Sequence, residues 1–85
     1  MNVKKIKVER VQTGVRIEKR MLKVLKAMAE YHDISLGDLL EGIVLYSFEG
    51  NSPFNDESVN RIEQLKQIYG MDYDSSAAHN LTEEE

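Results

Sequence analysis

Residues 11–17 read VQTGVRI, and this short stretch decides which fold we expect. Its odd positions carry β-branched side chains, whereas its even positions carry polar side chains or glycine. Such a period of two is typical of a β-strand that buries one face. We find no second strand pattern in the chain, so the simplest partner is the same strand of a second copy, related by a two-fold axis.

Two helical patterns follow this strand. Residues 18–32 place one apolar stripe on a helix, formed by Met21, Leu22, Leu25, Met28 and Ala29. Ser35 and Asp38 have the spacing of a capping box, which predicts the start of a second helix that runs through Phe48 and ends near Gly50. This second helix is apolar over much of its circumference, so we expect it to be buried on more than one side, as in a dimer core.

A third helix is predicted over about residues 55–69, with Asn55 as its cap and Gly70 at its end. Residues 71–85 are polar and close with three glutamates, which favours a disordered tail. We therefore divide the chain into a basic N-terminal arm, a core, a helical extension and an acidic tail: residues 1–7, 8–50, 51–70 and 71–85.

The size of the chain favours an oligomer. Its 85 residues form one domain at most, and a domain this small is only marginally stable by itself. The chain contains no cysteine, which excludes disulfides and thiolate metal sites, and His32 and His79 share no ligand spacing. We expect no metal or other cofactor, and association into a homodimer remains as the support for the fold.

Charge is distributed unevenly along the chain. Residues 1–30 carry nine basic and three acidic side chains, whereas residues 31–85 carry two basic and twelve acidic ones, which gives the net charge of −4. This asymmetry indicates either a polyanion partner for the first part or attraction between the two parts. We see no apolar run of membrane-spanning length, no signal peptide and no catalytic constellation, so we expect a cytoplasmic protein that is not an enzyme.

The order of short strand, helix, short turn and capped helix over residues 10–50 resembles the ribbon-helix-helix family of DNA-binding proteins. The resemblance is carried by residues 12–17 (QTGVRI), by the apolar stripe of the first helix, and by residues 34–38 (ISLGD). It implies a mainly α fold in which two chains pair their strands into an antiparallel ribbon. It also implies a bacterial-type transcriptional regulator that inserts this ribbon into the major groove of DNA.

The resemblance assigns roles to individual residues. The outward side of the strand would read bases through Gln12, Gly14 and Arg16, where Arg16 suits guanine and Gln12 suits adenine. Gly14 either allows close approach of the backbone to DNA or marks a missing contact. The phosphate contacts that position the protein would come from Lys4, Lys5, Lys7, Arg10, Ser35, Leu36 and Gly37. The core of the dimer would contain Val15, Ile17, Leu22, Leu25, Leu40, Ile43 and Val44.

Two alternatives stay open at this point. The acidic portion from residue 54 to 85 could bind a protein partner, as C-terminal extensions do in antitoxins of this family that neutralise a toxin. The chain could also be a dimer that has kept the fold and lost DNA binding. That alternative is motivated by Gly14, by Asp38 in the first turn of the phosphate-binding helix, and by the acidic total.

Overall fold

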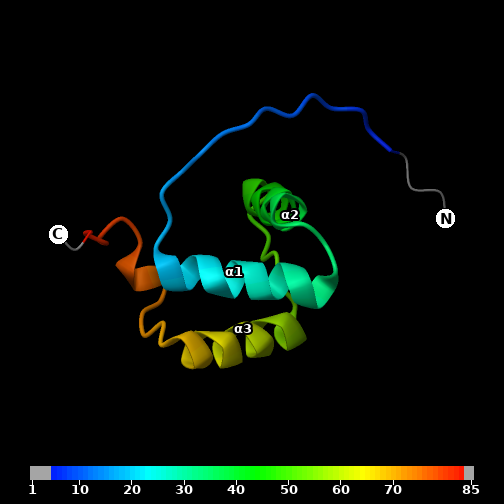
Figure 1. Ribbon diagram of the computed structural model, residues 1–85. Coiled ribbons are helices and arrows are strands. Elements are labelled where there is room, and N and C mark those ends of the chain that lie inside the picture. Colours follow the sequence, from blue (N-terminus) through cyan, green and yellow to red (C-terminus); the bar gives the residue numbers. More distant parts are fainter. Residues whose placement is uncertain (1–4, 84–85) are drawn as a thin grey trace.

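The computed structural model describes residues 5–83 of the chain and is mainly α, as expected. Its helices are α1 (Lys19–His32), α2 (Leu36–Phe48) and α3 (Asp56–Tyr69), followed by the short 3-10 helix η1 (Ser75–Ala77). Figure 1 shows α1 in the middle, with α2 on one side and α3 on the other. All three predicted α-helices are present, and none of those in the described residues is long and apolar enough to cross a membrane.

Each α-helix begins at a side-chain cap. Ser35 Oγ accepts a hydrogen bond from the Asp38 amide at 3.1 Å, which is one half of the predicted capping box. Asn55 Oδ1 accepts from the Ser58 amide at 2.8 Å, which confirms the predicted cap of α3. The Glu18 carboxylate accepts from the backbone N–H of Arg20 at 2.7 Å and caps α1. We did not predict this last cap because glutamate is not among the preferred N-cap residues.

The buried core lies where α1 meets its two neighbours. Its fully buried apolar residues are Val24, Met28, Ala29 and Leu39. Ile62, Leu65 and Tyr69 pack against this core from α3. The sequence pattern missed Val24, because a single stripe describes a helix covered on one side, whereas α1 is covered by α2 and by α3 on different sides.

Residues 5–17 leave the start of α1 as an extended arm that arches over α2, and we call this segment the arm (Figure 1). Within the described residues the arm forms no β-strand. A strand of the expected kind needs hydrogen bonds from a partner strand, and a single chain offers none. The ribbon therefore stays a prediction about two chains together.

Residues 70–83, which we call the C-terminal segment, return to the start of α1. Arg20 Nη1 donates to the Gly70 carbonyl at 2.7 Å, and the Tyr73 hydroxyl donates to Glu18 Oε1. Asp74 accepts from the Ser76 amide at 2.9 Å and so caps η1. Tyr73 is half-buried where it meets α1, and the disorder expected over residues 71–85 stays a prediction.

Candidate nucleic-acid interface and apolar surface

The three predicted base-reading residues lie on the exposed arm. Gln12, Gly14 and Arg16 are all exposed, and they alternate with apolar residues as the sequence pattern implies. A Cβ atom added to Gly14 would meet no other atom within 4 Å. Packing inside the chain therefore does not require glycine at this position.

Arg16 has a carboxylate partner from the far end of the chain. Its Nε lies 2.7 Å from Glu83 Oε1, and its Nη2 lies 3.1 Å from Oε2. Both side chains stay largely in solvent, with 85% of Arg16 and 70% of Glu83 exposed. An ion pair this exposed is weak, so a competing anion can displace it. Sequence reasoning missed the pair because nothing in the pattern connects positions 67 residues apart.

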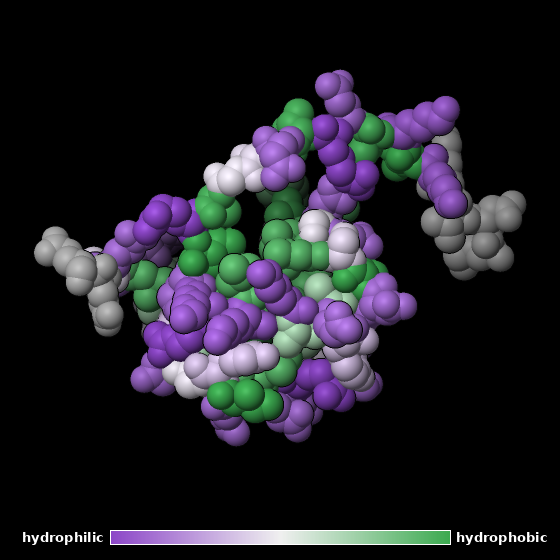
Figure 2. Space-filling view, in the orientation of Figure 1, coloured by the Kyte–Doolittle hydropathy of each residue, from purple (hydrophilic) through white to green (hydrophobic). Residues whose placement is uncertain are grey.

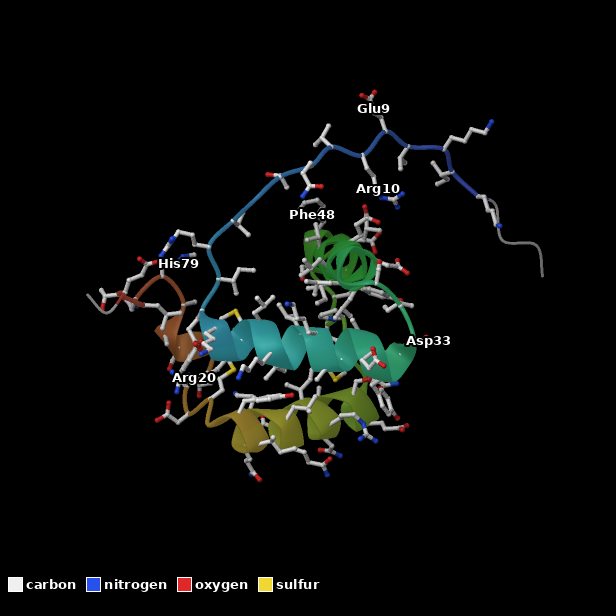
Figure 3. All side chains as sticks on the ribbon, in the orientation of Figure 1. Glu9, Arg10, Arg20, Asp33, Phe48 and His79 are labelled. Atoms are coloured by element: carbon white, nitrogen blue, oxygen red, sulfur yellow. The ribbon has the colours of Figure 1, made fainter. Side chains whose placement is uncertain are left out.

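Arg10 is held by α2. Its Nε and Nη2 donate to the two carboxylate oxygens of Glu41 at 2.8 and 2.9 Å. This hydrogen bond and the positive charge lower the pKa of Glu41, and the same contact raises the pKa of Arg10. In Figure 3 the Arg10 side chain points from the arm towards α2. The arginine that we expected at a phosphate thus links the arm to the body of the chain.

The predicted phosphate contacts at the start of α2 line a hollow of about 700 Å³ between this helix and the arm. Ser35 and Gly37 face it together with Arg10, but so do the carboxyl-bearing residues Asp38 and Glu41. Leu36 is half-buried beside them, whereas Lys5 and Lys7 are exposed on the arm, and Lys4 lies outside the described residues. A phosphate at this helix start would need Arg10 to offset the neighbouring carboxylates.

An apolar surface stays uncovered on the arm and on α2. It consists of Val11, Val15, Ile17, Val44, Leu45 and Phe48, and Val15 and Phe48 are 77% and 82% exposed. Figure 2 shows hydrophobic residues along the arm and on the body beneath it, and in Figure 3 Phe48 projects from α2 away from α1. A hollow of about 510 Å³ is lined by Val15 and Ile17 of the arm together with Leu22 and Leu40.

Of the seven predicted dimer-core residues, Val15, Ile17 and Val44 belong to this surface, Leu22 and Leu40 line hollows beside the arm, and Leu25 and Ile43 pack against the buried core. None is fully buried in the single chain: Val15, Ile17 and Val44 are exposed, and Leu22, Leu25, Leu40 and Ile43 are half-buried. The residues that the chain buries are different ones. A single chain thus forms a core around α1, which includes contacts of Leu25 and Ile43, and leaves Val15, Ile17 and Val44 exposed.

The basic residues of α1 divide into two groups. Lys19, Lys23 and Lys26 are exposed, and the ammonium of Lys23 lies 5.6 Å from the ring centre of Tyr69. Arg20 is half-buried and serves the fold, because besides Gly70 it contacts Glu18 and Asp72 at 3.4 and 3.5 Å. Its guanidinium also lies 5.6 Å from the ring centre of Tyr73. Any contact of α1 with a polyanion would therefore come from the lysines.

Comparison with protein-family models, with curated proteins and with solved structures gives no match. Among residues 5–83 no three His, Asp or Glu side chains gather in a way that could hold a metal ion.

Proposed function

We propose that this chain is a ribbon-helix-helix DNA-binding regulator that acts as a homodimer. The observation that carries the proposal is the division of the arm into two faces. Val11, Val15 and Ile17 form an apolar face that the chain itself leaves uncovered, whereas Gln12 and Arg16 form a polar face. Pairing with a second arm across a two-fold axis would place both apolar faces on one side of the ribbon, to pack against the helices, and both polar faces on the other.

The half-buried positions of α1 and α2 support the dimer. Leu22 and Leu40 line one hollow with Val15 and Ile17 of the arm. Leu40 and the exposed Val44 line another with Ile6 and Val8. A second copy that brings its own arm and α2 to this place would fill the hollows with apolar side chains. Each copy would then bury the surface that a chain of 85 residues cannot cover by itself.

The charge on the arm supports DNA as the ligand. Lys5 and Lys7 are exposed near its start, and Arg16 stands on its polar face. An antiparallel ribbon fits the width of the major groove, and an arginine fork reads guanine through two hydrogen bonds. A dimer has two arms, so twice as many of these cationic side chains would lie at one site on the duplex.

The test is fluorescence anisotropy at about 50 and 200 mM salt, on labelled DNA duplexes taken from the region upstream of the gene that encodes this chain. Arg16→Gln should abolish tight binding to the preferred duplex, and the affinity of the intact protein should fall by roughly 10³ to 10⁵ over this salt range for six to ten phosphate contacts. Lys66→Gln is the control, because it removes the same charge from α3. Absence of binding at the lower salt would contradict the proposal and leave a dimer without DNA affinity.

The protein-partner alternative has less support. Ile62, Leu65 and Tyr69 already pack against the core, so the inner side of α3 is not free for a partner. Residues 70–83 likewise return to α1, where Tyr73 and Gly70 hold them. A protein partner would have to use the outer side of α3, where Ile68 is 72% exposed.

A further inference from the structure

The C-terminal segment and the arm meet at the start of α1. Figure 1 shows the C-terminal segment, in orange and red, beside the point where the arm joins this helix. Glu18 stands at that junction and accepts the hydroxyl hydrogen of Tyr73, while Arg20 holds the carbonyl of Gly70. These contacts fix where the C-terminal segment begins its path towards the arm.

The later part of the segment continues along the same end of the molecule. Ala77 and Leu81 line a hollow of about 280 Å³ together with Met21 of α1 and Ile62 of α3. Two residues after Leu81, the Glu83 carboxylate meets the Arg16 guanidinium in the two-pronged contact described above. The anchored segment therefore delivers a carboxylate to the side chain that we expect to read DNA.

We propose that Glu83 competes with DNA for Arg16, so that the C-terminal segment is an autoinhibitory element. The inference rests on the proposed function. Glu83 occupies Nε and Nη2 of Arg16, and a guanidinium that donates both of these hydrogens to a carboxylate cannot use them for two hydrogen bonds to guanine. The guanidinium has further N–H groups, but the nearby carboxylate offsets the positive charge that attracts DNA.

Two physical properties set the strength of this competition. The carboxylate belongs to the same chain, so its effective concentration near Arg16 is high at any protein concentration. Both side chains are largely exposed, however, and exposed ion pairs are weak. The C-terminal segment therefore reduces DNA affinity by a small factor and does not abolish it.

The experiment compares the intact protein with Glu83→Gln and Glu63→Gln by anisotropy on the same upstream duplexes at about 50 mM salt. Glu63 is the matched control, because it is an exposed carboxylate, 61% exposed, whose Oε1 lies 3.7 Å from the Lys66 ammonium on α3. Both variants remove one negative charge and release one basic side chain. We expect Glu83→Gln to bind roughly two- to fivefold more tightly and Glu63→Gln to bind as the intact protein does.

The other outcomes contradict either the inference about Glu83 or the proposed function. Equal affinity of the intact protein and Glu83→Gln, or an equal gain in Glu63→Gln, overturns the inference and leaves the proposed function in place. Absence of binding by all three proteins overturns the proposed function, and the inference with it. A measurement without DNA tests the contact itself: the NMR signal of the Arg16 Nε–H group should shift in Glu83→Gln and not in Glu63→Gln, and an unchanged signal in Glu83→Gln would overturn the inference.

Discussion

Gly14 stands in the middle of the arm, between the two side chains that we expect to read bases. A methyl group there would meet no atom of the chain within 4 Å. We therefore expect Gly14→Ala to leave the free energy of unfolding within about 0.5 kcal/mol of the original, by urea denaturation. It should weaken DNA binding, because the added methyl keeps the ribbon backbone from the base edges. An unchanged DNA affinity would mean that the glycine marks a missing contact.

Arg10 and Arg16 show where sequence reasoning about the candidate site ends. Gln12, Gly14 and Arg16 are exposed on the arm, but so are the residues between them, so the two faces stay a prediction about paired strands. The period of two does not show that both arginines meet carboxylates, because Glu41 and Glu83 lie 31 and 67 residues away in the sequence. Such contacts depend on how the elements are arranged in space, and a local pattern does not contain that arrangement.

Among the elements, the α-helices could be predicted from the sequence, whereas the paths of the arm and of the C-terminal segment could not. Apolar periodicity and the caps Ser35 and Asn55 predict the α-helices well, because helix starts depend on residues close together in the chain. The arm differs, since a strand needs hydrogen bonds from another strand. The C-terminal segment differs too, because its contact with the start of α1 uses a tyrosine that lies 55 residues from Glu18 in the sequence.

The hydrogen bond between Tyr73 and Glu18 predicts how the stability of the protein changes at acid pH. The hydrogen bonds from Tyr73 and from the Arg20 amide lower the pKa of Glu18 below its ordinary value of 4.5, and burial raises the pKa of Tyr73 to about 12. A lowered carboxyl pKa adds stability that is complete above about pH 4.5 and is lost as the pH falls through the lower folded value. The tyrosine keeps its proton throughout this range.

We expect Tyr73→Phe to lose about 1 kcal/mol of unfolding free energy at pH 7, since it leaves the Glu18 carboxylate without this donor. Its stability should also fall less steeply than that of the intact protein between pH 5 and pH 3 in urea titrations. Tyr69→Phe is the control, because the structure shows no hydrogen bond to its hydroxyl from the described residues. Parallel pH profiles for the intact protein and Tyr73→Phe would contradict this assignment.

At the scale of the whole molecule, the uncovered apolar surface is the main feature that a single chain leaves unexplained. We expect light scattering on the intact protein to give the mass of two chains of 9.8 kDa. Val44→Glu places a charge in that surface and should shift the mass to one chain, because burying an unpaired charge at an interface is costly. Ile68→Glu, on the outer side of α3, should stay dimeric. Equal masses for the two variants would place the interface elsewhere.

The measurement that tests the central claim most directly is amide hydrogen exchange over residues 11–17 of the intact protein at several protein concentrations. In an antiparallel two-stranded ribbon, alternate residues donate their amide hydrogens across the pair, while those between them face solvent. The account predicts alternating protection in this stretch that strengthens with protein concentration. Rapid exchange at every position and at every concentration would mean that the arm does not pair with a second copy.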